Sequence, residues 1–331
     1  MGLIAARRIL STLAIACVGS ALLPGAGMAQ PTDWPSRPIR LIVGYPPGGG
    51  ADTVARLLAD RLSKSLGQAV LVDNRAGASG AIGATAVARA EADGYMLLVA
   101  ASSEISVAPA TIKALPYDPV RDFKPVAQLA KWPFILATLA SSPTSSLGEL
   151  IAYAKANPGK LSYSSFGNNS MNHLIGEDFK LKAGINAVHI PYKGSGPSLT
   201  GLLGGEVQYT FDAPATMLAL ISAGRLRPLA VTSAQRLPNA SQIPTMAEAG
   251  LPDLLASGWI GLLAPAKTPA AITAKLGEAV AAILQSESFR TELQNRSILP
   301  GSGTAEEFAQ AIQSEIAAWR QIGPRVGITP G

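Results

Sequence analysis

The sequence predicts an α/β fold with two mainly parallel sheets flanked by helices, and three observations support this prediction. Short runs rich in β-branched residues alternate with stretches whose apolar residues recur at helical spacing. Glycine-rich loops connect several of these expected strands to the helix that follows. Hydrophobic residues make up 48% of the chain and charged residues 15%, which excludes a disordered protein. Strands that alternate with helices imply parallel sheets covered on both faces.

The expected strands and helices follow one another along the chain. The first strand, 39–43, is an apolar run rich in β-branched residues, and apolar residues recur at helical spacing from 54 to 66 behind it. The last two helices, 272–284 and 306–322, are amphipathic. Further strands are expected at 69–72, 95–100, 134–138, 187–191, 207–211 and 229–232. Further helices are expected at 147–156, 171–181 and 198–203.

Two interruptions divide this pattern into two domains. One lies at Lys131-Trp132-Pro133, and the other is the stretch 236–252, which is rich in proline and polar residues. Between them lie about 115 residues, which fits the usual domain size of roughly 100 to 150. We therefore expect a discontinuous domain 1 of residues 31–131 plus 253–331, and an inserted domain 2 of residues 132–252. The two chain crossings would form a hinge, with a cleft between the domains.

Residues 1–29 have the pattern of a secretory signal peptide. Arg7 and Arg8 supply the positive start, an apolar stretch runs from 9 to 23, and small residues stand at Gly27 and Ala29. Cleavage is expected before Gln30, which makes the mature protein an exported one. No other stretch of the sequence is long and apolar enough to cross a bilayer.

Three other interpretations of the same segment stay open. A membrane anchor would need roughly 20 apolar residues, but small and polar residues dilute this stretch and Pro24 ends it. A lipid anchor on Cys17 would need a better residue than Ala14 three positions upstream. A twin-arginine signal is disfavoured by Ser11, which stands where a second large apolar residue is needed.

The composition excludes several classes of site. Cys17 is the only cysteine, so a chain cleaved after Ala29 has no disulfides, no thiolate metal sites and no cysteine nucleophile. We expect neither a metal centre nor a cofactor. Lys and Arg total 27 against 22 Asp and Glu, a formal net charge of +5. Because the basic residues are dispersed, with no run of five or more, a nucleic-acid partner is not expected.

A glycine-rich loop joins the first strand to its helix and offers a site for an anion. The helix N-terminus presents unpaired N–H groups and a partial positive charge, and glycines let an anion approach the backbone. Such a loop favours a carboxylate or phosphate without a Lys or Arg side chain. The alternative is a tight turn capped by Asp52, which would use the same N–H groups internally. It has neither the Walker nor the dinucleotide-binding glycine spacing. The candidate ligand contacts are Tyr45, Gly48, Gly49, Gly50, Ala51, Asp52 and Thr53.

A second loop, 74–83, again leads from a strand into a helix. Two neighbouring helix N-termini would close on one carboxylate from two sides. Arg75 is either a ligand group or a partner in an ion pair with Asp73 or Asp52. The candidate ligand contacts of this loop are Gly77, Ala78, Ser79 and Gly80.

A third loop, 164–173, opens a helix of the expected second domain and mixes hydroxyl, amide and glycine residues. It would receive the far end of a ligand held by the first domain. His173 has an alternative role in helix packing or in bracing the loop. The candidate ligand contacts are Ser165, Gly167, Asn168, Ser170 and His173.

An ordered set of motifs resembles one family. The motifs are YPPGGGAD at 45–52, NRAGASG at 74–80, PYKG at 191–194, LLGGEV at 202–207, FD at 211–212, PTMAEAG at 244–250, Trp259, and APAKTP at 264–269. Together they cover nearly the whole mature chain and resemble the Bug-type receptors of tripartite tricarboxylate transporters.

The resemblance implies a two-lobed, type II-like periplasmic binding protein that closes around a small organic carboxylate. In that family the first two loops grip a carboxylate through backbone N–H groups, and the third loop and the aspartate matching Asp212 meet the ligand from domain 2. The family often places a small polar residue where Ser102 stands. Glu104 departs from the family pattern, because small or polar residues are usual there. If Glu104 faced the cleft, it would repel a second ligand carboxylate.

The resemblance also implies partners and a location. The partners are the small organic acid and the membrane permease subunits of the transporter, and we expect a periplasmic monomer. One alternative is an exported receptor that signals to a membrane sensor kinase with the same fold and loops. A less favoured alternative is an exported hydrolase, which would need a nucleophile, a base and an orienting group within reach. The chain has no G-x-S-x-G elbow and only two histidines, so we expect no enzyme and assign no catalytic residue.

Overall fold

The computed structural model describes residues 34–168, 170–296 and 298–325. The expected signal peptide, its cleavage site and Cys17 lie outside the described residues. None of the helices in the described ranges combines the length and the apolar character that a membrane span requires.

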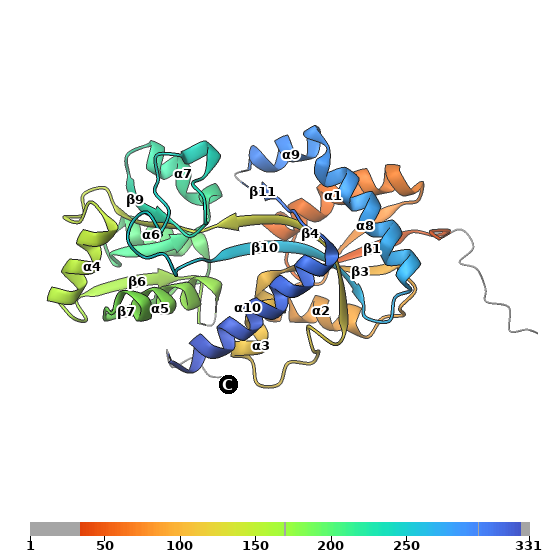
Figure 1. The fold of residues 1–331 in the computed structure, drawn as a ribbon, viewed down its shortest axis with the longest axis horizontal. Helices are drawn as coiled ribbons and strands as arrows, with labels where there is room; N and C mark the ends of the chain where they lie inside the picture. The colour runs from red at the N-terminus through yellow and green to blue at the C-terminus, as the bar shows by residue number, and fades with distance from the viewer. Residues whose placement is uncertain (1–33, 169, 297, 326–331) are drawn as a thin grey trace, which may run out of the picture. The chain divides into compact units, whose positions relative to one another are not determined.

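Two mixed sheets flanked by helices make up the described chain (Figure 1). The first sheet has the strand order β11-β4-β10-β3-β1-β2. In it β1 pairs in parallel with β2 and β3, whereas β10 runs antiparallel to β3 and β4, and β11 antiparallel to β4. Its strands are β1 (Ile39–Val43), β2 (Val70–Asn74), β3 (Met96–Ala101), β4 (Phe123–Pro133), β10 (Ser257–Pro265) and β11 (Leu299–Pro300).

The second sheet is built only from the segment between β4 and β10. Its strand order is β7-β6-β8-β5-β9, with β6 parallel to β7 and β8 and with β5 antiparallel to β8 and β9. Its strands are β5 (Ile135–Leu139), β6 (Leu161–Ser165), β7 (Ala187–Pro191), β8 (Tyr209–Asp212) and β9 (Leu226–Val231). The α/β class with two sheets is therefore confirmed, but the strand pairing is mixed and not mainly parallel.

The unexpected antiparallel pairing comes from two long strands that the sequence pattern did not indicate. Lys131-Trp132-Pro133, taken above as an interruption, is the end of β4 and pairs with residues 257–259 of β10. Figure 1 shows β4 and β10 side by side where the chain passes between the two sheets. The crossings are therefore regular strands. The domain boundaries drawn from the sequence remain a prediction.

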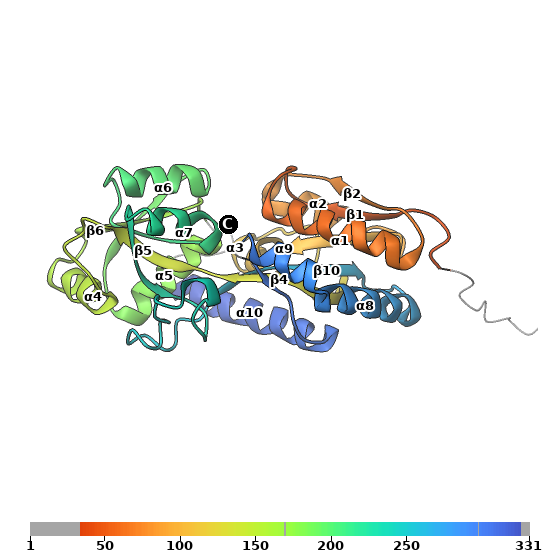
Figure 2. The same ribbon diagram turned by 90° about the horizontal axis from the view of Figure 1, so that it is seen from above.

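The helices cover both sheets. The helices that accompany the first sheet are α1 (Gly50–Leu66), α2 (Ala81–Ala88), α3 (Ala108–Thr111), α8 (Ala270–Gln285), α9 (Glu287–Gln294) and α10 (Ala305–Arg325). Those that accompany the second are α4 (Leu147–Ala156), α5 (Met171–Ala183), α6 (Ser195–Leu203) and α7 (Pro214–Ser222). Both α5 and α6 contact β6 and β8, and Figures 1 and 2 show them on opposite faces of the second sheet.

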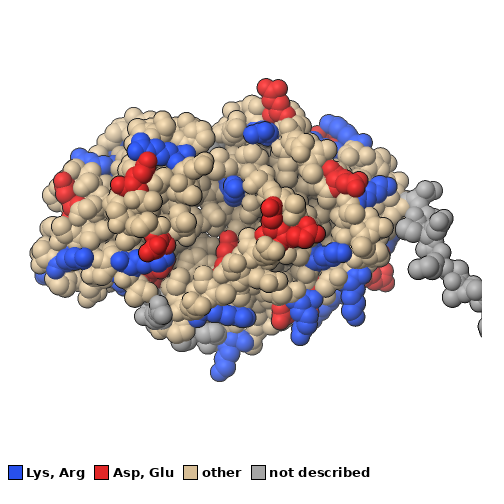
Figure 3. Space-filling model, in the orientation of Figure 1, with Lys and Arg blue, Asp and Glu red and all other residues tan. Residues whose placement is uncertain are grey.

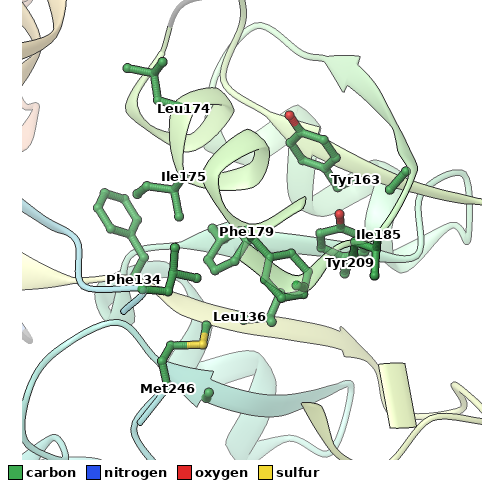
Figure 4. Close-up of a cluster of buried hydrophobic side chains, with 14 of the residues drawn as sticks. Phe134, Leu136, Tyr163, Leu174, Ile175, Phe179, Ile185, Tyr209 and Met246 are labelled. Atoms are coloured by element: carbon green, nitrogen blue, oxygen red, sulfur yellow. The ribbon is translucent and has the colours of Figure 1, made fainter. Parts of the chain in front are cut away.

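Aromatic side chains fill the core between the second sheet and α5 (Figure 4). Tyr163 and Tyr209 come from adjacent strands and stack with ring centroids 5.5 Å apart. Phe179 of α5 meets Tyr209 edge-on at 5.7 Å. All three side chains are fully buried, so aromatic packing stabilises the strands β6 and β8, which end at the third loop and at Asp212.

Charged side chains are mixed in sign on the face of the molecule shown in Figure 3. Several of them pair within one helix, as Lys64 does with Asp60 and Lys182 with Asp178. Interspersed charges of this kind produce no large field of one sign over that face.

Candidate functional site

The segments that follow β1, β2 and β3 lie at one edge of the first sheet. The parallel strands β2, β1 and β3 are neighbours, and each is followed at its carboxyl end by a loop that leads into a helical turn. Ligands in open α/β sheets bind beyond the carboxyl ends of the strands. The loops after β1 and β2 carry the candidate residues Tyr45 to Thr53 and Gly77 to Gly80, and Ser102 directly follows β3.

The loops after β1 and β2 are in direct backbone contact. A Cβ atom added to Gly44 would lie 2.6 Å from the Cα atom of Gly80, and one added to Gly83 would lie 2.9 Å from the Cα atom of Gly44. Both distances are shorter than any real Cβ contact. Only glycine at these positions lets the start of α2 lie against the end of β1. The contact thus places the start of α2 against the end of β1, the strand that leads into the first loop.

The first loop keeps part of its amide hydrogens available. Gly49 precedes α1 with an extended backbone, and the Gly48 N–H donates to Asp52 Oδ2 at 2.8 Å. Within the described part of the chain, the N–H groups of Gly49, Gly50 and Ala51 have no hydrogen-bond acceptor. The turn capped by Asp52 is therefore present, but it uses one amide hydrogen and leaves a row of three at the positive end of α1.

Asp52 is held in the loop by its own bonds. Its carboxylate accepts from Arg56 Nε at 2.9 Å and from Asn74 Nδ2 at 2.9 Å, and its side chain is almost fully buried. Burial raises the pKa of Asp52, but the hydrogen bonds from Arg56, the Gly48 amide and Asn74 outweigh it and lower the pKa to about 2. Asp52 thus acts in this structure as an ionised cap that shapes the loop.

The second loop has an unusual backbone. Ala78 and Ser79 have φ angles of 48° and 51°, in the left-handed region that costs a residue with a Cβ about 1–2 kcal/mol. Such strain tends to be kept at ligand-binding and catalytic sites. Ala78 and Ser79 are exposed, and their N–H groups have no acceptor among the described residues. Arg75 donates to Asp73 Oδ2 at 2.9 Å, so it forms the ion pair that the sequence left open.

Glu104 links the loops from beneath. It lies in the π-helical turn Ser103–Val107 after β3, and its side chain is fully buried. Its Oε2 accepts from the Tyr45 hydroxyl at 2.6 Å and its Oε1 from the Ala101 amide at 2.8 Å. Burial raises the pKa of Glu104 to about 7, although both hydrogen bonds act in the opposite direction. Ser102, just before this turn, is also buried.

The third loop lies at the carboxyl end of β6 in the second sheet. Ser170 is the N-cap of α5 and accepts from the His173 amide at 3.3 Å. Asn168 is exposed, Gly167 and Ser170 are half-buried, and Ser165 and His173 are buried. Of this group, Asn168, Gly167 and Ser170 are therefore the ones open to a ligand.

Both histidines of the chain support this loop from within. The rings of His173 and His189 stack with centroids 3.8 Å apart, and His189 Nε2 lies 2.6 Å from Ser165 Oγ. Burial, together with His173 and Lys180, lowers the pKa of His189 to about 3, so its ring is neutral. The Ser165 hydroxyl donates to the Gly167 carbonyl at 3.0 Å. The contacts to His189 and Gly167 thus fix the Ser165 side chain within the loop.

Asp212 stands at the end of β8, next to the third loop, and is also buried. Its carboxylate accepts from Ser195 Oγ at 2.6 Å, from the Ala213 amide at 2.6 Å and from Thr216 Oγ1 at 2.9 Å. Burial raises its pKa, and these hydrogen bonds oppose that rise. Asp212 therefore joins the starts of α6 and α7 in this structure, and a ligand contact through it stays a prediction.

The candidate residues thus form two groups, one at the edge of each sheet. No backbone hydrogen bond among the described residues joins the two groups. Sequence reasoning missed three side-chain interactions in these loops: Ser195 with Asp212, His189 with Ser165, and Tyr45 with Glu104. The sequence did contain a signal for His189: it lies two residues after Ala187 on an expected strand, so both side chains are on the same face of the sheet.

Comparison with known proteins identifies the family. The description "Tripartite tricarboxylate transporter family receptor" belongs to a family whose sequence profile matches residues 54–328. The chain belongs to this receptor family. The resemblance inferred from the loop motifs is therefore confirmed, and so is the class of solute-binding receptors to which the fold belongs.

Individual relatives of this receptor family cover almost the full length of the chain. The protein BugT of Bordetella pertussis is 38% identical over 91% of this chain and 94% of its own. A solved structure of R. palustris Rpa4515 with adipate is 38% identical, with a TM-score of 0.78 over 90% of this chain and 100% of that one. MatC of Rhodopseudomonas palustris, solved with bound malate, is 32% identical with a TM-score of 0.73, over 87% and 99% of the two chains.

Proposed function

We propose that this protein is a periplasmic receptor that captures a small organic carboxylate and delivers it to the membrane permease of a tripartite tricarboxylate transporter. It acts as a monomer after export and cleavage of its signal peptide near Ala29. The observation that carries the proposal is the row of unpaired amide hydrogens at residues 49–51, in a loop whose start contacts the second loop through Gly44 and Tyr45. Amide hydrogens at a helix N-terminus favour an anion without any basic side chain.

The ligand class follows from the same loops and from the relatives. Amide donors recognise a carboxylate, and two relatives of 38% and 32% identity were solved with adipate and with malate. We therefore propose a dicarboxylate whose first carboxylate binds the loops of the first sheet. Its far end meets Gly167, Asn168 and Ser170 at the edge of the second sheet. Tighter binding to a closed arrangement of the two sheets would drive closure around the ligand.

The contact between Ser165 and His189 does not support a catalytic function. Ser165 is fully buried and its hydroxyl hydrogen is bonded to the Gly167 carbonyl. A sensor that passes its signal to a membrane kinase would use the same ligand loops, and no feature of the described chain favours it over uptake. Ligand capture is the step that both receptor functions share, so a binding measurement tests either of them.

Deleting one amide hydrogen tests the proposal. Proline is well tolerated at the first position of a helix, and the extended backbone of Gly49 (φ −76°, ψ 170°) suits the residue before a proline. Gly50→Pro should therefore leave the fold intact and remove one donor. A hydrogen bond to a charged group contributes roughly 1.5–3 kcal/mol, so the affinity for adipate or malate should fall about tenfold to a hundredfold in calorimetry.

A matched control is available at the start of α8, a helix that accompanies the same sheet. Ala270 is the first residue of α8, and Pro269 before it has an equally suitable backbone (φ −53°, ψ 140°). Ala270→Pro should leave both the melting temperature and the affinity unchanged. Equal affinities for the two variants would contradict the amide grip. If the purified protein, freed of co-purified ligand, bound no member of a panel of carboxylates, the receptor function itself would be wrong.

A further inference from the structure

Glu104 touches both loops that bind the carboxylate in the proposed function. A Cβ atom added to Gly80 would lie 2.8 Å from the Glu104 Cδ and 3.1 Å from the Tyr45 hydroxyl, so the carboxyl group packs directly against the second loop. Through Tyr45 it also reaches the first loop, because the Tyr45 hydroxyl donates to Glu104 Oε2 at 2.6 Å. The same hydroxyl lies 3.2 Å from the Ser79 carbonyl oxygen.

These contacts allow Glu104 to affect ligand binding in two ways. It holds Tyr45 and the strained Ser79 in place, and it puts a buried titratable carboxyl beneath the loops that receive an anion. We propose that Glu104 is a positioning residue for the carboxylate site and that it takes up a proton when the ligand binds. This inference rests on the proposed function and adds to it a dependence of affinity on pH.

The proton uptake follows from the sign of the charges. Glu104 is out of contact with water, and the nearby ligand carboxylate disfavours its ionised form. The pKa of free Glu104 is raised to about 7 by burial, and a second negative charge nearby raises it further. Above about pH 7 the free protein carries an ionised Glu104, and the bound protein regains the proton. Affinity should therefore be constant at low pH and fall as the pH rises through the pKa of the free group.

Among the described residues, no Lys or Arg side chain is bonded to Glu104 or contributes to the shift of its pKa. The ionisable groups next to Glu104 are Tyr45 from the first loop and Tyr117, whose hydroxyl donates to the Glu104 carbonyl oxygen at 2.7 Å. On α10, which packs on the same π-helical turn, Glu315 accepts from Trp259 Nε1 at 2.8 Å. On α1, Asp52 is paired with Arg56.

The first experiment uses the unaltered protein. Adipate binding is measured by calorimetry from about pH 6 to about pH 9, in buffers that differ in ionisation enthalpy, which reports the protons taken up. Above the pKa of Glu104 we expect uptake of up to one proton per ligand and a tenfold or greater loss of affinity by about pH 8.5 relative to about pH 6.5. The carboxyl groups of the ligand, whose ordinary pKa values lie below this pH range, stay mainly ionised throughout.

The second experiment assigns the effect to Glu104. In Glu104→Gln the amide keeps both bonds, since its oxygen accepts from Ala101 and its nitrogen donates to the Tyr45 oxygen. This variant should bind adipate with a flat pH profile and without proton uptake. Glu315→Gln is the matched control: Glu315 is another carboxyl whose pKa is raised by burial, but it bonds to Trp259 and not to the loops. It should keep the slope of the unaltered protein.

A comparison of Glu104→Ala with Glu104→Gln tests whether Glu104 holds Tyr45 in place. Glu104→Ala removes the support of Tyr45 and should lower the affinity at least tenfold at every pH, whereas Glu104→Gln restores it. A flat profile without proton uptake in the unaltered protein would overturn the inference while leaving the carboxylate receptor intact. A slope that persists in Glu104→Gln would also overturn it. Absence of binding to every carboxylate at every pH would instead remove the proposed function.

Discussion

Asp52 shapes the first loop without using all of its amide hydrogens. A cap at this position and an anion site compete for the same donors, so the sequence left both possibilities open. The structure divides the donors between them: the Gly48 amide bonds to Asp52, while those of Gly49, Gly50 and Ala51 have no acceptor in the described chain. The choice could not be made from sequence, because it depends on Arg56 and Asn74 holding the carboxylate in one orientation.

Glu104 should also affect stability in a pH-dependent way. Its pKa rises from 4.5, the usual value, to about 7 on folding, so the folded state binds the proton more tightly. Its contribution is therefore favourable at low pH and is lost as the pH rises from about 4.5 to about 7. Relative to the unaltered protein, Glu104→Gln should gain up to about 3 kcal/mol of unfolding free energy between about pH 4.5 and about pH 8.

Urea unfolding of the two proteins at both pH values measures this difference. The same difference in unfolding free energy at each pH would mean that Glu104 has an ordinary pKa in the folded state. Glu315→Gln serves again as a comparison. Burial also raises the pKa of Glu315, so this variant should change the unfolding free energy with the same sign, without any effect on the glycine loops.

At the scale of elements, the contact between β1 and the start of α2 places the second loop against the end of the strand that leads into the first. Gly44→Ala should disturb this contact, since its Cβ would lie 2.6 Å from the Gly80 Cα and the backbone would have to move. We expect a loss of about 1–3 kcal/mol in unfolding free energy and a weaker affinity for dicarboxylates. Gly148→Ala, in the first turn of α4 with open space around its Cβ, should change neither.

Denaturant unfolding and calorimetry on both variants check this prediction. A stable Gly44→Ala protein with unchanged affinity would show that the two loops need not be in contact to form the site.

The sequence predicted the elements whose patterns are local. The strand expected at 134–138 corresponds to β5 (Ile135–Leu139), and the helix expected at 147–156 coincides with α4. The long strands β4 and β10 were missed, because Trp132, Pro133 and Gly258 resemble an interruption unless the strand that pairs with them is known. The short helices α2 and α7 were missed as well, because their alanine-rich sequences show little amphipathic pattern.

At the scale of the whole molecule, the two crossings between the sheets are tied together at one residue. Thr232 Oγ1 accepts from the Phe134 amide at 2.8 Å and donates to the Ala256 carbonyl oxygen at 2.6 Å. Residues nearly 100 positions apart thus meet at the place where a hinge was expected. A cavity of about 480 Å³, lined by Trp132, Trp319 and others, lies beside this junction and away from the glycine loops.

The site itself could be predicted only in part. The glycine loops led us to expect an anion site, because glycines before a helix let an anion approach its unpaired amide hydrogens, and that site remains a prediction. The bonds of Glu104 to Tyr45 and of Ser195 to Asp212 join residues that are distant in sequence, and no local pattern specifies them. For the same reason the sequence could not tell that Asp212 is buried.

A crystal structure of the protein with adipate bound tests the central claim most directly. We predict that one carboxylate of the ligand lies with its oxygens about 2.7–3.1 Å from amide nitrogens of residues 49–51 and of Ala78 or Ser79. A ligand held by basic side chains alone, or seated in the cavity beside Trp132 and Trp319 with these amides unbonded, would contradict the account.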